Sequence, residues 1–171
     1  GLIFRPATVC GYAPRQRLDL SVNILTNHAI NKNKITIFGG EQLRPNLHIQ
    51  DYCDFVKLAI EAPTEKIKNQ QFNVGYQNLS MTEIGKLVKK VVETEFSDKL
   101  NIDLVFTKSD DKRSYHICSD KVKKILGFQP KYSIEDAVKE LCEHFKEGEF
   151  KNSFEDDKYF NVQRLKRIHA A

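Results

Sequence analysis

The feature that most constrains the fold of this sequence is an alternation of short apolar runs with longer amphipathic stretches. The amphipathic stretches place apolar residues three or four positions apart, as in Leu18, Val22 and Leu25, which predicts helices. They cover residues 18–31, 52–62, 80–96, 119–126 and 133–148. The apolar runs, at residues 2–5, 35–38, 71–75 and 102–106, predict strands. Alternating strands and helices predict an α/β fold.

The first apolar run, Leu2-Ile3-Phe4, begins almost at the first residue. Continuously apolar strands belong to parallel sheets covered on both faces, where each strand needs partners from neighbouring βα units. The units in this chain are too irregularly spaced for a complete doubly wound sheet. We therefore expect the chain to be the later part of a larger α/β fold.

Size and composition favour one globular unit. The chain has 171 residues, of which 40% are hydrophobic and 29% charged, as in soluble globular proteins. No apolar run approaches the roughly 20 residues that span a bilayer, and no signal peptide is present, so we expect a cytoplasmic protein without membrane contact. Residues 1–150 are expected to form the folded unit, and residues 151–171 a charged tail with some helix near residues 163–168.

Cysteines and histidines give no sign of a metal site. The four cysteines are widely separated and include no Cys-x-x-Cys pair, so we expect buried free thiols rather than a zinc site or disulfides. The histidines at positions 28, 116, 144 and 169 have no partners at ligand spacing and are interpreted as structural or solvated. The expected metal content is therefore none.

The net charge of +4 comes from scattered lysines and arginines with three local clusters, near residues 86–90, 121–124 and 164–167. Such clusters weakly favour an acidic ligand. A nucleic-acid partner is not expected, because the chain shows neither a basic stripe nor a recognition-helix context. A nucleic-acid binder would have to show steeply salt-dependent binding to a duplex.

The stretch 43–51, Leu-Arg-Pro-Asn-Leu-His-Ile-Gln-Asp, follows a glycine turn at Gly39-Gly40. Pro45 disfavours helix at Arg44, and the alternation of Leu47 and Ile49 with polar residues predicts a strand with one buried face. Asp51 is interpreted as the N-cap of the next helix. An arginine on such a rigid segment can hold a phosphate or carboxylate, while the alternative is a solvated surface arginine.

No catalytic constellation stands out, because the chain contains no Gly-x-Ser-x-Gly, no P-loop, no His-Glu-x-x-His and no Gly-x-Gly-x-x-Gly motif. Five short motifs together nevertheless resemble the NAD-dependent epimerase/dehydratase family of extended short-chain dehydrogenases/reductases. They occur in the family's order at residues 2–11, 39–51, 72–75, 113–121 and 126–130. The resemblance covers residues 2 to about 146 and the family's later half. It implies a truncated Rossmann-type fold, with the last strands of the parallel sheet plus the smaller substrate-binding α/β region.

The resemblance also implies roles for five residues. Pro6 and Ala7 match positions beside the nicotinamide of the cofactor, and Thr8 matches a position that touches the sugar. Arg44 and Arg113 match arginines that reach the diphosphate of a nucleotide diphosphate sugar. Two guanidinium groups converging from separate loops suit a diphosphate, because each offers a planar pair of donors. Arg15 and Arg17 match a loop that borders the substrate cleft.

The chain departs from the family in what it lacks. The glycine-rich dinucleotide fingerprint is absent, and no tyrosine has a lysine four places on, so the Tyr-x-x-x-Lys catalytic pair is absent too. Cys10 stands where a tyrosine is frequent. The full-length family uses NAD or NADP, but we expect this chain alone to bind neither and to be inactive. Its chemistry, whether an isomerase-type epimerisation, a dehydration or a reduction, cannot be assigned to residues present.

Two expectations concern partners. The chain is expected to bind a nucleotide diphosphate sugar, with a non-catalytic binding or interaction module on the same scaffold as the alternative function. The strand formed by Leu2 to Arg5 is expected to lack a neighbour on one side, and exposed strand edges pair with other copies. We therefore also expect self-association through that edge.

Overall fold

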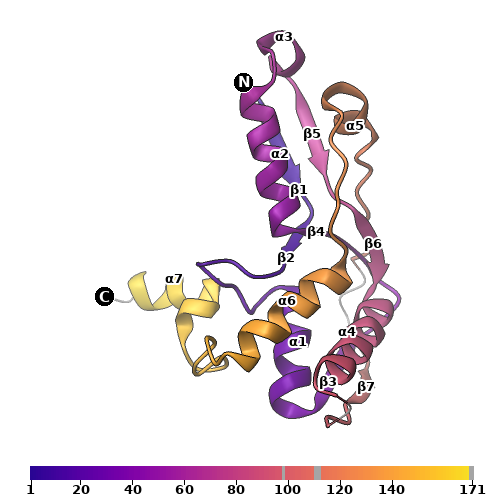
Figure 1. The fold of residues 1–171 in the computed structure, drawn as a ribbon, viewed down its shortest axis with the longest axis vertical. Coiled ribbons are helices and arrows are strands. Elements are labelled where there is room, and N and C mark those ends of the chain that lie inside the picture. The colour runs from indigo at the N-terminus through magenta and orange to yellow at the C-terminus, as the bar shows by residue number, and fades with distance from the viewer. Residues whose placement is uncertain (98, 110–112, 170–171) are drawn as a thin grey trace.

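The computed structural model describes residues 1–97, 99–109 and 113–169 (Figure 1). Strands and helices alternate through most of the chain, which confirms the predicted α/β class. The strands are β1 (Ile3–Pro6), β2 (Thr8–Cys10), β3 (Lys34–Phe38), β4 (Leu43–His48), β5 (Gln71–Val74), β6 (Gln77–Ser80) and β7 (Asp103–Thr107). The helices are α1 (Ser21–Lys32), α2 (Ile49–Glu61), α3 (Thr64–Ile67), α4 (Met81–Glu95), α5 (Asp120–Leu126), α6 (Ile134–Lys146), a 3-10 turn (Asp157–Tyr159) and α7 (Asn161–His169).

The described strands form three small sheets. β1 pairs with β5, β3 pairs with β7, and β4 lies between β2 and β6. All pairs are parallel except β4 with β6. Parallel two-stranded sheets do not close on themselves, so each leaves an unpaired edge within the described chain.

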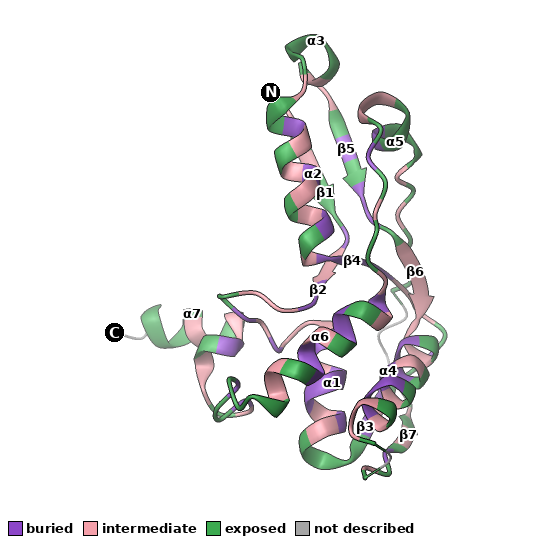
Figure 2. Cartoon of the chain, viewed as in Figure 1, coloured by how far each residue is buried: buried purple, intermediate pink, exposed green. Residues whose placement is uncertain are grey.

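Two cores hold these sheets. The upper part in Figure 1 packs α2 and α5 around β1 and β5, with Phe55, Phe72 and Val122 fully buried. The lower part packs α1 and α4 against β3 and α6 against α1 and α4, with residues such as Val22, Ile37 and Val138 fully buried. Figure 2 shows the buried residues along the facing sides of these three helices. Gly85 of α4 allows close packing on β3, because an added Cβ would lie 2.6 Å from a side-chain carbon of Ile37.

Local capping residues set most of the helix starts. Ser80 and Ser133 each form a reciprocal capping box, with Glu83 and Asp136. The Ser-x-x-Glu pattern of residues 80–83 predicts the first box, whereas for Ser133 the sequence predicts only a helix cap. The glycine after Leu126 predicts a helix end, and Gly127 does end α5 in the left-handed conformation. The sequence also predicts Ser119 as the N-cap of α5, and this prediction is wrong, because the Ser119 side chain accepts no hydrogen bond from the helix. Its hydroxyl instead bonds the backbone N–H and carbonyl of Gly75.

The stretch 43–51 differs from its prediction in two ways. β4 ends at His48, and its last four residues are all buried, so the expected single buried face does not exist. Helix α2 begins at Ile49, and His48 rather than Asp51 is its N-cap, since the His48 Nδ1 accepts the N–H of Gln50. Asp51 lies in the first turn. Its carboxylate accepts the backbone N–H groups of Lys131 and Tyr132 instead.

The C-terminal segment packs on the rest of the chain. Phe150 and Tyr159 are buried with Leu18 and Leu141, and Leu18 N–H donates to the carbonyl of Tyr159 at 3.0 Å. The expected helix near residues 163–168 lies within α7. Among the described helices, none combines the length and apolar character needed to cross a bilayer.

The cysteines are free, but only half of them are buried. Cys10 and Cys142 are buried, and burial raises the pKa of each thiol to about 12. Cys53 and Cys118 are exposed, so the expectation of buried thiols is wrong for these two. Each exposed thiol lies on a surface segment, Cys53 on α2 and Cys118 just before α5.

Candidate functional site

Arg44 lies near the start of β4, where Pro45 keeps the chain extended. Its side chain is half-buried and donates from one guanidinium nitrogen to the carbonyls of Leu43 and Arg113. The guanidinium also lies over the ring of Tyr115, 5.4 Å from its centroid. These contacts fix Arg44 against the segment that carries the second predicted arginine.

The segment 113–119 runs beside β4 and β6 without forming a strand. Leu43 N–H donates to the Ser114 hydroxyl at 3.0 Å, and Tyr115 N–H donates to the Leu43 carbonyl at 3.4 Å. Further along, the Asn78 side chain bonds both the N–H and the carbonyl of Ile117. Arg113 itself is exposed. The structure therefore brings Arg44 and Arg113 together, although they lie 69 residues apart in the sequence.

The three smaller predicted residues follow one another at the junction of two sheets. Pro6 ends β1 opposite Val74, and Ala7 N–H donates to the Val74 carbonyl at 2.7 Å. Thr8 begins β2 opposite Asn46 of β4, two residues after Arg44. Ala7 is buried and Thr8 is half-buried. A chain crossing from one sheet to the other thus places Thr8 on the strand next to the one that bears Arg44.

Two buried polar side chains of β4, Asn46 and His48, make hydrogen bonds or ion pairs that hold the strand in place. The amide nitrogen of Asn46, a residue only 1% exposed, donates to the Arg44 carbonyl at 2.8 Å. The Nε2 of His48 lies 3.3 Å from a carboxylate oxygen of Glu140, which also accepts the N–H of Tyr12. The strand carrying Arg44 is therefore tied to α6 as well as to its neighbouring strands.

Sequence reasoning missed Tyr115 and Asn78. Tyr115 is half-exposed beneath the Arg44 guanidinium, and Asn78 fixes the backbone two residues further on. Tyr115 stands two residues after Arg113, so its place in the same motif could have marked it. Asn78 gives no such signal, because its partner Ile117 lies 39 residues away.

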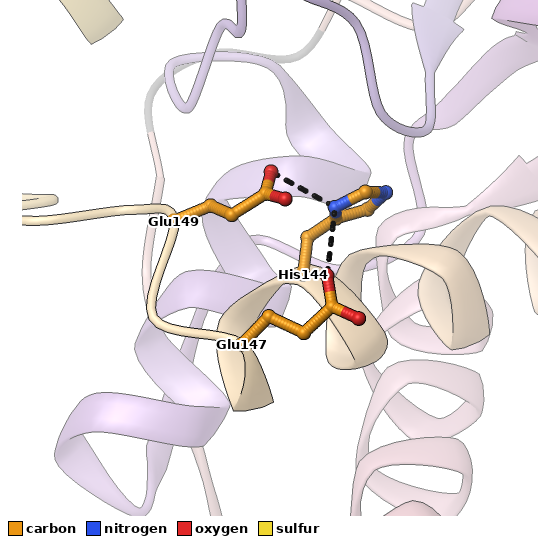
Figure 3. Close-up of side chains that lie close together, drawn as sticks. All are labelled: His144, Glu147 and Glu149. Atoms are coloured by element: carbon orange, nitrogen blue, oxygen red, sulfur yellow. Dashed lines mark hydrogen bonds and ion pairs between the residues drawn. The ribbon is translucent and has the colours of Figure 1, made fainter.

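A second polar cluster lies at the C-terminal end of α6 (Figure 3). The His144 Nδ1 is 2.9 Å from a carboxylate oxygen of Glu149 and 3.8 Å from one of Glu147. The interpretation of His144 as a residue without partners at ligand spacing is therefore wrong. One ligand atom from each residue lies within 4.8 Å of the others, as a metal ion would require. Both glutamates are exposed and already pair with the ring, so we assign an ion-pair cluster.

Tyr12 covers this cluster. Its ring stacks on that of His144, with centroids 3.5 Å apart. Desolvation raises the pKa of the Tyr12 phenol, and the charge of Glu149, to which the phenol is hydrogen bonded, raises it further. The spacing His-x-x-Glu-x-Glu at residues 144–149 could have predicted this local cluster from the sequence.

Comparisons with known proteins place the fold among enzymes of nucleotide sugars. The sequence profile of a family described as GDP-mannose 4,6 dehydratase matches residues 12–141. A curated dTDP-glucose 4,6-dehydratase from Shigella flexneri is 23% identical over 140 residues, which cover 78% of this chain and 38% of that protein.

Two similar solved structures are also enzymes of nucleotide sugars. A UDP-glucose 4-epimerase from Thermotoga maritima, solved with UDP-glucose, is similar with a TM-score of 0.68 and 26% identity. A UDP-glucuronic acid 4-epimerase from Bacillus cereus, solved with UDP-glucuronic acid and NAD, is similar with a TM-score of 0.69 and 26% identity. Each likeness covers 85% of this chain and 45% of the other chain. The chain thus spans less than half the length of these relatives.

Proposed function

This chain belongs to the NAD-dependent epimerase/dehydratase family, through the group described as GDP-mannose 4,6 dehydratase, and we propose that it holds the nucleotide-sugar substrate of such an enzyme. The observation that carries the proposal is the contact between Arg44 and the main chain of Arg113. Two arginines from separate segments meet at one place on the molecule, next to the strand that bears Thr8.

The two guanidinium groups would bind the diphosphate of the substrate. A diphosphate offers oxygens to several planar donors at once, and arginine keeps its charge at any physiological pH. The Tyr115 ring beneath Arg44 and the hydrogen bonds that hold residues 114–117 would limit the freedom of both arginines before the substrate binds. Preorganised donors lose less entropy on binding.

Thr8 would contact the sugar, and Pro6 and Ala7 would face the nicotinamide of NAD or NADP in the full-length protein. The short β1–β2 junction places these three residues in succession. We propose that this chain alone binds neither cofactor tightly and is inactive, because it contains no glycine-rich fingerprint and no Tyr-x-x-x-Lys pair. Epimerisation, an isomerase reaction, or dehydration would then depend on residues outside this sequence.

We propose a cytoplasmic location on chemical grounds. Cys53 and Cys118 are exposed and free. Exposed free thiols persist in reducing compartments and are oxidised or paired in most extracellular proteins.

Calorimetric titration with UDP-glucose tests the diphosphate site. Replacing both arginines, Arg44→Ala and Arg113→Ala, should weaken binding at least about tenfold, because a hydrogen bond to a charged group contributes about 1.5–3 kcal/mol. Arg167→Ala is a matched control, since Arg167 is an exposed arginine paired with Asp157 on the C-terminal segment. Equal affinity of the double variant and the unchanged chain would refute the assignment.

A further inference from the structure

A cavity of about 460 Å³ lies between the loop of residues 12–16 and the C-terminal segment. We propose that this cavity binds a phosphate monoester carried on an aromatic ring. Three features lead to this assignment: the cavity is built by anchored segments, aromatic rings contribute to its lining, and one of its arginines makes no ion pair with the residues that the structure describes.

The two walls of the cavity are held in place by buried contacts. Leu18 N–H donates to the Tyr159 carbonyl, and Asn161 N–H donates to a carboxylate oxygen of Asp19 at 3.0 Å. Leu18 is fully buried and Tyr159 is 3% exposed. The two walls lie 142 residues apart at the Asp19 contact, so the cavity depends on the folded C-terminal segment.

Hydrogen bonds within the loop hold the wall formed by residues 12–16 in place. The Gln16 side chain, 6% exposed, accepts the N–H of Ala13 and donates to the carbonyls of Gly11 and Arg17. On one side Tyr12 is stacked on His144. The backbone that carries Arg15 and Tyr12 is therefore held in one conformation.

Aromatic side chains form much of the lining. Tyr12, Phe150 and Tyr159 all line the cavity, with ring centroids of neighbouring pairs 6.2 and 6.3 Å apart. Rings at such separations pack against one another, and Phe150 and Tyr159 are only 9% and 3% exposed. Tyr12 is therefore the ring of the three that is most open to a planar ligand. The volume lies within the usual range for small-molecule sites.

The charged lining leaves one arginine without an ion pair among the residues that the structure describes. The charged residues of the lining are Arg15, Lys158, Arg164 and Glu149. Lys158 pairs with Asp156 and Arg164 with Asp157, whereas Arg15 makes no hydrogen bond or ion pair with the residues the structure describes. A phosphate monoester carries about −1.5 to −2 at pH 7 and accepts hydrogen bonds from several donors. The guanidinium N–H groups of Arg15 are therefore available to bind the phosphate.

The cavity includes the loop of Arg15, which by resemblance borders the substrate cleft, but it does not include the two arginines of the proposed nucleotide-sugar site. The cavity lining includes neither Arg44 nor Arg113. Figure 1 shows α7, one wall of the cavity, on the opposite side of the molecule from β6, which pairs with the strand of Arg44. Either assignment can fail without the other.

Phenyl phosphate is the probe, and amide chemical shifts of the full chain are the readout. We expect saturable shifts at residues lining the cavity, among them Gln16, Phe150 and Lys158, with a dissociation constant of about 1 mM or tighter. Inorganic phosphate should bind at least about tenfold more weakly, because it cannot use the aromatic walls. Equal affinity for the two probes, or shifts elsewhere on the chain, would overturn the proposal.

Arg15→Ala should weaken phenyl phosphate binding about tenfold, and Arg15→Lys should restore part of it. The matched control is Arg5→Ala, because Arg5 is an exposed arginine of β1 outside the cavity lining. Arg15 is itself exposed on a loop, so its replacement should leave the amide spectrum of the rest of the chain unchanged. Unaltered affinity in Arg15→Ala would refute the site.

Discussion

The carboxylate of Asp51 joins two segments that lie 80 residues apart in the sequence. It is 1% exposed and accepts two backbone N–H groups, from Lys131 and Tyr132, at 2.8 and 3.0 Å. These two residues lead into α6. One side chain therefore positions the start of α6 against α2, close to the β4 strand that carries Arg44.

Asp51→Ala should lower the free energy of unfolding by about 2–4 kcal/mol, because it leaves two N–H groups without their charged acceptor. Chemical denaturation measures the change. Asp54→Ala is the matched control, since Asp54 lies one turn further along the same helix, is only partly buried and pairs with Lys131 at 3.6 Å. The control should change stability by less than about 1 kcal/mol. A similar small loss in both variants would contradict this role for Asp51.

Residue roles were predictable where the partner is near in sequence. Ser80 and Glu83 lie three residues apart, and their reciprocal capping followed directly from that spacing. Asp51 and Ser119 could equally have capped the helices that follow them. Their actual partners lie 80 and 44 residues away, and only the tertiary fold brings them within reach. The five predicted site residues depended on motif resemblance, and their binding roles stay predictions.

At the scale of elements, the helix starts are the best-defined features. The Ser133 hydroxyl accepts the Asp136 N–H, and the Asp136 carboxylate accepts the Ser133 N–H at 2.8 Å. Hydrogen bonds from the Ser133 side chain and backbone lower the pKa of Asp136 below its usual 3.8. The capping box is therefore strongest when Asp136 is ionised.

Ser133→Ala should lower the free energy of unfolding by about 1 kcal/mol at pH 7, and Ser133→Gly by only a few tenths. The folded-state pKa of Asp136 lies below its unfolded value, so its contribution is present above about pH 4 and is lost as the pH falls through the folded pKa. The difference between Ser133→Ala and the unchanged chain should shrink on acidification. Denaturation at several pH values measures this, and a difference that grows at low pH would contradict it.

Short strands escaped sequence prediction. β2 and β6 contain three and four residues, and neither shows a run of apolar residues or a clear alternation. They are strands because β4 offers hydrogen bonds on both of its sides, with Thr8 opposite Asn46 and Arg44 opposite Leu79. Longer elements with an apolar stripe, such as α1 and α4, followed from periodicity alone.

At the scale of the whole molecule, β1 has an edge that no described strand covers. β1 pairs with β5 on one side and with no other strand that the structure describes. Ile3 of this strand is 49% exposed. An exposed apolar edge of a parallel sheet is a template for a further strand.

We predict that the chain self-associates through this edge. Sedimentation velocity should show a concentration-dependent dimer, and Ile3→Lys should shift the population toward monomer, because charged residues on an edge oppose strand pairing. Val162→Lys is the matched control, since Val162 is an exposed apolar residue on α7, 63% exposed. A strictly monomeric chain at high concentration, or an equal effect of both variants, would contradict the prediction.

We predict that this chain, which matches 45% of the length of its structural relatives, carries a nucleotide-sugar site without a dinucleotide site. Parallel calorimetric titrations of the full chain with UDP-glucose and with NAD test it most directly. We expect saturable binding of UDP-glucose that depends on Arg44 and Arg113, and no binding of NAD in the micromolar range. Micromolar NAD binding, or no saturable UDP-glucose binding, would contradict it.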